Sequence, residues 1–443
     1  MGCLVIIVLT AVLGLYMAWN IGANDVANSM GCAVGSRSVS IRWAVILAGI
    51  CEFAGAVLVG AHVTDTVRKG IVDPARIASL PGLGEGEAAA LVLVGMAASL
   101  LAAAIWLNAA TWMGMPVSTS HAIVGAIAGF GIIAAGWSAV DWSKMGQIVA
   151  SWFLSPLAGG VLGYTVFKVI SKLILGRKRP VPAAITITPF VVFFLMVVVT
   201  LAITYKGLSH LTGEHAKWIT GNGAFLVAAA VGLVSALVSK ALIRRALRGK
   251  EDLPLPEQLE LVERVFAPLV VVTSCAVAFS HGANDVANAV GPLAAIVDIA
   301  SSCTVKMRVF VPAWVLVLGG SGIVLGLATY GYRVMHTVGS KITQITPSRG
   351  VAASVAATVT VLICTRMKLP VSTTHTLVGA ILGIGLARGF GAVNRRVTRD
   401  IFESWFITVP AAAIMTMLLF MLGKAFLLEH VRQALCQSMP AGG

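Results

Sequence analysis

The stretch Gly22-Ala-Asn-Asp-Val-Ala-Asn-Ser-Met-Gly31 returns later in the chain as Gly282-Ala-Asn-Asp-Val-Ala-Asn-Ala-Val-Gly291, with eight of the ten positions identical. A second stretch, Pro116-Val-Ser-Thr-Ser-His-Ala-Ile-Val-Gly-Ala-Ile127, is repeated as Pro370-Val-Ser-Thr-Thr-His-Thr-Leu-Val-Gly-Ala-Ile381, with nine of twelve identical. Both pairs follow in the same order. The chain is therefore an internal duplication, and each half is expected to fold much like the other.

The composition indicates that lipid is the solvent of this chain. Of its 443 residues, 58% are hydrophobic and only 11% are charged, whereas soluble domains average about 25% charged residues. A membrane-spanning helix needs roughly 20 apolar residues. Such runs lie at about 3–20, 41–61, 88–108, 146–170, 183–205, 222–243, 264–280, 309–330, 350–365 and 404–428. Two shorter runs, at 121–136 and 375–388, follow the Pro-Val-Ser-Thr motifs and are interpreted as half-helices.

We therefore expect an all-α integral membrane protein with about 10–12 transmembrane segments, some of them broken or re-entrant. The first apolar run lacks the basic region of a secretory signal, so we interpret it as a mature segment. The seven cysteines have neither metal-site spacing nor a disulfide pattern, and we interpret them as packing residues.

The basic residues predict how the chain crosses the membrane. A net charge of +14 would suggest nucleic acid for a soluble protein. Here the basic residues gather between apolar runs, as the positive-inside rule expects, so no nucleic-acid partner is predicted. Basic clusters at 172–179, 240–250 and 388–399 place those loops in the cytoplasm. The equivalent runs 146–170 and 404–428 then cross in opposite directions, which predicts two inverted-topology repeats.

Three regions follow from this organisation. Residues 1–175 form the first transmembrane repeat, and residues 263–443 form the second. Residues 176–262 hold a central pair of helices and a polar cytoplasmic linker. The linker is expected at 244–264, because prolines punctuate this polar stretch.

The first repeated motif carries a carboxylate into apolar surroundings. A charged carboxylate at the bilayer centre costs on the order of 2.5–3.5 kcal/mol, so it usually faces a partner or a wet cavity. Neither decapeptide contains Lys or Arg. A proton or a bound cation could neutralise the charge, and the carboxylate and amide oxygens suit Na⁺ better than a soft metal. The glycines at the motif ends suggest broken helices whose freed backbone groups coordinate a ligand. The less favoured alternative is that the Asn and Asp side chains only bond neighbouring helices and the glycines allow close packing. The polar residues are Asp25 with Asn24 and Asn28, and Asp285 with Asn284 and Asn288.

The second repeated motif offers the complementary chemistry. Its proline disfavours helix in the preceding residue, so a new helix can begin there. The free N–H groups of that helix, together with side-chain hydroxyls, would form a cradle for an anion. Alternatively, the hydroxyls bond back to the preceding turn. The hydroxyls belong to Ser118, Thr119 and Ser120 in one copy and to Ser372, Thr373 and Thr374 in the other. His121 and His375 are expected to orient a hydroxyl or link helices rather than act as ligands.

Two further ionisable residues have no counterpart in the other half. Glu52 lies inside an apolar run, where a buried acid is a functional candidate by default. Arg366 comes just before the second Pro-Val-Ser-Thr motif. It could hold an anion near the entrance, but we favour an arginine that extends to the membrane interface.

The four motifs resemble the signature of the inorganic phosphate transporter (PiT) family, and the likeness spans almost the whole chain. Two further stretches match, 263–268 and 280–296. The resemblance implies a prokaryotic-type, cation-coupled importer of inorganic phosphate in the plasma or inner membrane, acting as a homodimer. Its co-transported ion would be Na⁺ or H⁺, with no other cofactor.

By position, the resemblance assigns phosphate contacts to the six hydroxyl residues at 118–120 and 372–374, with Asn28 and Asn288. It assigns cation binding to Asp25, Asp285, Asn24 and Asn284. The chain departs from many relatives at Ser120, where they have Thr, and at Ser354, where they often have Glu. The second departure bears on the identity and number of the coupling ions.

Three alternatives remain at this point. A sulfate permease of the same fold is possible because both anions are tetrahedral, but only protonated phosphate can donate a hydrogen bond to Asp25 or Asp285. An intramembrane hydrolase could use the Ser, Thr, His and Asp residue types. It is disfavoured because both copies of each motif are intact. A passive channel fits poorly, since duplicated half-helix sites suit alternating access around one central site.

Overall fold

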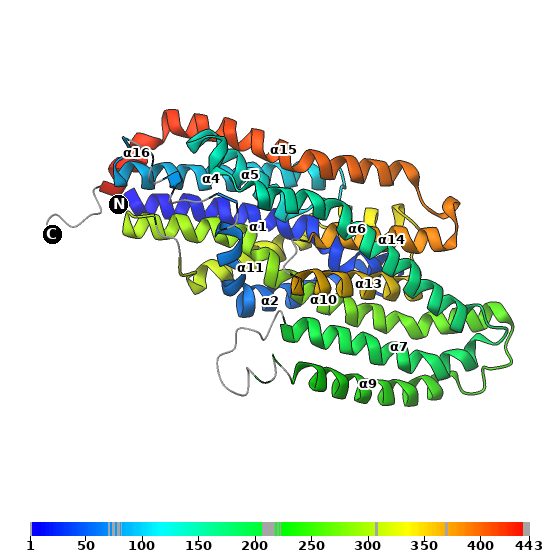
Figure 1. Cartoon of the computed structure of the whole chain (residues 1–443). Coiled ribbons are helices and arrows are strands. Elements are labelled where there is room, and N and C mark those ends of the chain that lie inside the picture. Colours follow the sequence, from blue (N-terminus) through cyan, green and yellow to red (C-terminus); the bar gives the residue numbers. More distant parts are fainter. Residues whose placement is uncertain are drawn as a thin grey trace.

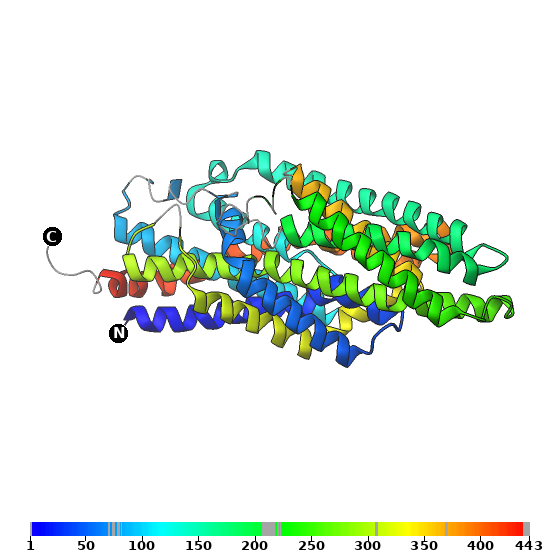
Figure 2. The same cartoon turned by 90° about the horizontal axis from the view of Figure 1, so that it is seen from below.

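The computed structural model describes residues 2–436 apart from 70, 73–75, 78–79, 81, 206–217, 219–220, 222, 306–308 and 368–370. Its helices lie roughly side by side in one elongated bundle, seen from two directions in Figures 1 and 2. The first and last described helices meet at the same end, where Cys3 Sγ lies 3.3 Å from the carbonyl oxygen of Ala434.

The helices form two sets with a hairpin between them. The first half comprises α1 (Gly2–Gly35), α2 (Ile41–Lys69), α4 (Glu85–Trp112), α5 (Thr119–Ala135) and α6 (Trp142–Ile170). The hairpin consists of α7 (Pro180–Ile203) and α9 (Ala224–Leu247). The second half comprises α10 (Leu255–Ser302), α11 (Ala313–Thr329), α12 (Tyr332–His336), α13 (Pro347–Arg366), α14 (Thr373–Arg388), α15 (Arg395–Phe426) and α16 (Leu428–Cys436).

The described residues confirm an all-helical, multi-pass membrane protein. Nine of their helices are long and apolar enough to cross a membrane. A tenth span results if α11 is joined to the segment Tyr332–Lys341, from which it is bent by 57°. Each apolar run predicted from the sequence lies on a helix. The two helices that carry the first repeated motif are much longer than their runs, however: α1 continues to Gly35 where the run ended at 20, and α10 spans Leu255–Ser302 where the run covered 264–280.

Contacts between the halves occur in matching pairs. In the first pairing, α2 packs on α10 while α11 packs on α1. In the second, α6 packs on α14 while α15 packs on α5. Figure 1 shows that α1 and α10 run in opposite directions, as do α6 and α15. Most of the interior is therefore built between the halves rather than within one of them.

The first repeated motif lies inside continuous helices, so the expected helix breaks there were wrong. Residues 22–31 belong to α1 and residues 282–291 belong to α10. Their glycines instead allow close packing. A Cβ on Gly22 would overlap the carbonyl oxygen of Ile323, and a Cβ on Gly282 would overlap that of Glu52. Each motif is thus pressed against a helix of the opposite half.

The second repeated motif does start new helices, as predicted. Ser118 is the N-cap of α5, and its hydroxyl accepts a hydrogen bond from the backbone N–H of His121 at 3.3 Å. Ser372 caps α14 in the same way, with the N–H of His375 at 3.3 Å. These caps satisfy one of the free N–H groups at each helix start. At 17 and 16 residues, α5 and α14 are shorter than the nine described helices that can span a membrane alone, as expected of half-helices.

The linker between the halves is shorter than expected. Only residues 248–254 are non-helical, because α9 continues to Leu247 and α10 begins at Leu255. Pro256 lies in the first turn of α10, where its missing N–H costs no hydrogen bond. The boundary predicted at 262 therefore falls within α10. An ion pair of 3.1 Å between Arg179 and Asp252 joins this loop to the one that follows α6.

Candidate functional site

The two aspartates of the repeated motif meet where α1 and α10 pack together. Asp25 and Asp285 are both buried, and His281 lies between them. Its Nε2 atom is 2.9 Å from Asp285 Oδ2 and 3.3 Å from Asp25 Oδ2. Sequence reasoning missed His281, which precedes the second motif where the first copy has Ile21. A signal was present, since an ionisable residue next to a repeated acidic motif in an apolar run is a functional candidate.

Glu52 completes this cluster from α2. Its Oε1 atom lies 3.6 Å from His281 Nδ1 and accepts a hydrogen bond of 3.1 Å from the Ser29 hydroxyl. Glu52 was singled out because it lacks a counterpart in the second half, and His281 lacks one in the first. The two asymmetric residues are therefore neighbours, and together they make the two halves of the site chemically different.

Each motif helix reaches across to the half-helix of the other repeat. Asn28 on α1 donates from Nδ2 to the Thr374 hydroxyl at 2.8 Å. Asn288 on α10 donates from Nδ2 to the Ser120 hydroxyl at 3.1 Å. The same amides also lie 3.0 and 3.4 Å from the aspartates of their own helices. The structure thus brings four of the predicted phosphate-binding residues next to two of the predicted cation-binding residues, Asp25 and Asp285. The four are Asn28, Asn288, Ser120 and Thr374.

The hydroxyls at the two helix starts differ in what they contact. Thr119 lies 3.4 Å from Asn288 Nδ2, and the hydroxyl of Thr374 lies 3.4 Å from Asp25 Oδ1. Ser118 and Ser372 face their own backbones as helix caps. The hydroxyls of Ser120 and Thr374 are therefore the ones next to the aspartates, at 3.5 Å from Asp285 Oδ1 and 3.4 Å from Asp25 Oδ1.

Asn24 and Asn284 are used differently in the two halves. Asn24 donates to the Thr111 hydroxyl and the Met115 carbonyl, both at 3.0 Å, and accepts from the Val117 N–H at 3.1 Å. It thereby holds the chain on both sides of Pro116, at the start of α5. Asn284 donates to the carbonyl of Ser280 at 2.8 Å, within its own helix. Cation binding by these two residues stays a prediction.

The two motif histidines form a separate contact behind the half-helices. The rings of His121 and His375 meet edge to face, with centroids 4.9 Å apart. Trp405 stacks on His375 at 3.7 Å and donates from Nε1 to the carbonyl of Pro116 at 2.9 Å. Trp152 lies against His121 at 5.7 Å. This arrangement supports the interpretation that the histidines link helices.

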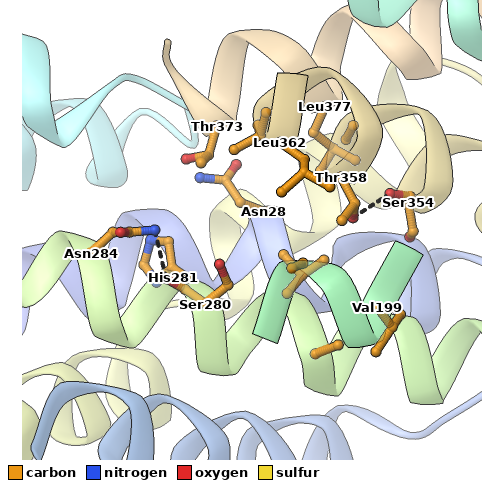
Figure 3. A pocket seen from close by; sticks show the side chains of 15 residues that line it. Asn28, Val199, Ser280, His281, Asn284, Ser354, Thr358, Leu362, Thr373 and Leu377 are labelled. Carbon is orange, nitrogen blue, oxygen red and sulfur yellow. Dashed lines mark hydrogen bonds between the residues drawn. The ribbon is translucent and has the colours of Figure 1, made fainter. Parts of the chain in front are cut away.

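A small cavity opens beside the cluster, between α1, α7, α10, α13 and α14. Its volume is about 50 Å³, and a single water needs only ~10–15 Å³ of such space. Figure 3 shows Asn28, His281, Asn284 and Thr373 around it, with Ser354 and Thr358 farther along α13. Ser354, where the family resemblance leads one to expect a glutamate, therefore faces the same space as the site. Arg366 ends α13, and its side chain lies outside the described residues.

The electrostatics of the cluster favour cations. Three carboxylates, from Asp25, Asp285 and Glu52, surround one imidazole and are all buried. Four of the buried oxygen atoms have no hydrogen bond of regular geometry among the described residues: Asp25 Oδ2, Asp285 Oδ2, Glu52 Oε2 and Asn28 Oδ1. Asp25, His281 and Asp285 each offer a ligand atom within 4.8 Å of the others. A single imidazole cannot offset three buried carboxylates, and buried carboxylates are costly unless a cation or a proton joins them.

Comparisons with known proteins agree with each other. The model of the phosphate transporter family matches residues 21–416. A protein of Thermococcus kodakarensis that is provisionally named a phosphate permease is 44% identical, covering 94% of this chain and 97% of its own. Inorganic phosphate transporter 2-1 of Arabidopsis thaliana is 39% identical, covering 92% of this chain and 70% of its own. A solved structure named as the sodium-dependent phosphate transporter superposes with a TM-score of 0.81 at 38% identity, covering 96% of this chain.

Proposed function

Because the chain belongs to the phosphate transporter family, a family of transporters and not of enzymes, we propose that it carries inorganic phosphate across the membrane together with a cation. Na⁺ is the proposed coupling ion, and H⁺ is the alternative. The observation that carries this proposal is the junction of the halves. There the amides of Asn28 and Asn288 bond the hydroxyls of Thr374 and Ser120 next to Asp25 and Asp285.

The charges of the junction supply the reason for coupling. Three buried carboxylates with a single imidazole repel a phosphate anion until cations enter, so the affinities for cation and anion become linked and reciprocal. The proposed cation ligands are Asp25 Oδ2 and Asp285 Oδ2, the two carboxylate oxygens that face His281. The proposed phosphate contacts are the hydroxyls at 118–120 and 372–374 with the two amides. The name of the solved relative, a sodium-dependent phosphate transporter, favours Na⁺.

The arrangement of the halves supports alternating access. Matching helix pairs run in opposite directions, and both halves contribute to one central site, as in transporters built from inverted repeats. Rocking one set of helices against the other would expose this site to each side in turn. The homodimer implied by the family resemblance stays a prediction.

The test is uptake of labelled phosphate into proteoliposomes that hold the full chain. An inward Na⁺ gradient and an inward H⁺ gradient are imposed separately, with excess unlabelled sulfate or phosphate as competitor. We expect Na⁺-driven uptake that phosphate blocks and sulfate does not. Uptake driven only by H⁺ would assign Asp25 and Asp285 to proton transfer. Full competition by sulfate, or uptake without either gradient, would overturn the substrate or the coupling.

A further inference from the structure

A large apolar groove lies on the outside of the bundle, away from the site. It has a volume of about 590 Å³ and runs between α6, α14 and α15, in the range of sites that hold a small molecule or a lipid chain. Its walls include Phe153, Leu157, Val161 and Phe406, which are 59%, 65%, 58% and 44% exposed. Such a surface belongs to the membrane region and needs an apolar occupant.

One end of the groove is strongly basic. Along α15, Arg395 and Arg399 stand seven residues before the lining residues Phe402 and Phe406, which places them on the same helix face. On α6, the ammonium of Lys168 lies 5.6 Å from the ring centroid of Tyr164, which also lines the groove. Lys172 follows one turn later.

Carboxylates offset only part of this charge. Arg399 lies 3.2 Å from Glu403 and 3.9 Å from Asp400. Residues 168–172 and 395–403 together carry five basic side chains and two acidic ones. This is the end of the bundle that the positive-inside rule places in the cytoplasm, where the leaflet carries anionic lipids.

We propose that this groove binds an anionic phospholipid, with one acyl chain along Leu157 and Phe406 and the phosphate group at Lys168 and Arg395. The charge at one end and the apolar length behind it match the two parts of such a lipid, whereas a lipid without net charge would leave the excess of positive charge unmatched.

The floor of the groove connects the lipid to the transport site. Trp405, which lines the groove, stacks on His375 and hydrogen-bonds the carbonyl of Pro116. It therefore contacts the start of both half-helices. Trp152 lies beside it and contacts His121. An acyl chain that packs against these tryptophans would hold the first turns of α5 and α14 in place. These turns carry the hydroxyls proposed to bind phosphate, so the bound lipid should raise the rate of phosphate uptake.

The primary test measures lipid retention, which does not depend on transport. The purified full chain is titrated with phosphatidylglycerol or phosphatidylcholine, and bound lipids are counted by native mass spectrometry. We expect preferential retention of phosphatidylglycerol. Removing two basic side chains in a Lys168→Gln, Arg395→Gln variant should lower its retention roughly 30-fold, at about 1 kcal/mol for each side chain. The matched control is Arg244→Gln, Arg248→Gln, which removes two charges at the same end but on α9.

A second variant tests the apolar part. Leu157→Trp fills the groove from an exposed position, so it should reduce phosphatidylglycerol retention while the protein keeps its thermal stability. Equal retention of the two lipids, or equal loss in the α9 control, would overturn the proposal. If the native protein is a species of twice the chain's mass and the Leu157→Trp variant is a monomer, the groove would instead be the contact surface for a second copy of the chain.

Discussion

At the scale of single residues, the site is a junction of acids that share one imidazole. Asp25 and Asp285 come from equivalent positions of the two halves, but Glu52 and His281 do not. The second pair lies 3.6 Å apart, within the same cluster. The duplicated residues therefore provide the common ligands, and the unpaired residues distinguish one half of the site from the other.

Removing the charge of either aspartate should remove a coupling ligand. Asn in place of Asp25 or Asp285 keeps the shape of the side chain but weakens cation binding, so we expect a roughly 10–100-fold loss of gradient-driven uptake. The measurement is initial uptake at several Na⁺ concentrations. Glu260→Gln is the control, since Glu260 is an exposed acid that pairs with Arg264 on the outside of α10. Unchanged Na⁺ dependence in both aspartate variants would refute their role as ligands.

His281 and Glu52 should act as one unit. In a double-mutant cycle with His281→Gln and Glu52→Gln, we expect the double variant to lose much less than the product of the single losses. Residues in contact show interaction energies of about 0.5–3 kcal/mol. The readouts are the KM for phosphate and the Na⁺ concentration at half-maximal uptake. Simple multiplicative losses would show that the two side chains work independently.

At the scale of helices, the repeated glycines set how closely the halves approach. A Cβ on Gly282 meets backbone atoms of Glu52, which cannot rotate away as a side chain can. Gly282→Ala should therefore push α2 from α10, move Glu52 away from His281, and lower both uptake and thermal stability. Gly146→Ala on α6 is the matched control, because a Cβ there meets nothing within 4 Å. The control should gain up to about 1 kcal/mol of stability. A Gly282→Ala protein with normal uptake would contradict this account.

The start of α6 offers a test of capping and its pH dependence. Asp141 is the N-cap of this helix, and its Oδ1 accepts the backbone N–H of Lys144 at 3.1 Å. That hydrogen bond lowers the pKa of Asp141, so its stabilising contribution is present above the unfolded pKa of about 3.9. The contribution is lost as the pH falls through the lower, folded-state pKa.

Accordingly, Asp141→Ala should cost about 1 kcal/mol near neutral pH, whereas Asp141→Asn, which still caps, should cost less. Thermal unfolding in detergent at pH 7 and at decreasing pH measures both effects. The gap between the native protein and Asp141→Ala should narrow in acid. A stability difference between the two proteins that grows in acid would contradict a lowered pKa of Asp141 in the folded state.

The sequence predicted the positions of the helices better than the positions of breaks within them. Apolar length identified the spans, and Pro116 and Pro370 marked new helix starts because a proline restricts the residue before it. The glycines of the first motif suggested breaks, yet both helices continue through them. A glycine in an apolar run can mark either a helix break or a close contact with another helix. The sequence does not distinguish the two, because the difference depends on which helix packs against the glycine. His281 was missed for a related reason, since comparing the two halves directs attention to what they share.

At the scale of the whole molecule, the two halves contribute to each other's structure. Each motif helix of one half bonds the half-helix of the other, through Asn28 with Thr374 and Asn288 with Ser120. Neither half alone contains a complete site. Since the contacts of Asn28 with Thr374, of Asn288 with Ser120 and of His281 with Asp25 cross between the halves, a relative movement of the halves must rearrange the site itself, and this is the property that coupled transport requires.

The basic loops should all face the cytoplasm. The loops after α6, after α9 and before α15 lie at one end of the bundle in Figure 1, and the ion pair between Arg179 and Asp252 joins two of them. The first residues of α1 and the last residues of α10 lie at the other end. Single cysteines introduced at Lys178 and Arg248, in a variant without native cysteines, should react with a membrane-impermeant maleimide only after the cells are permeabilised. A cysteine at Ser301, which is exposed at the far end of α10, should react in intact cells. The opposite labelling pattern would show that the molecule has the inverse orientation in the membrane. The basic end of the lipid groove would then lie in the outer leaflet.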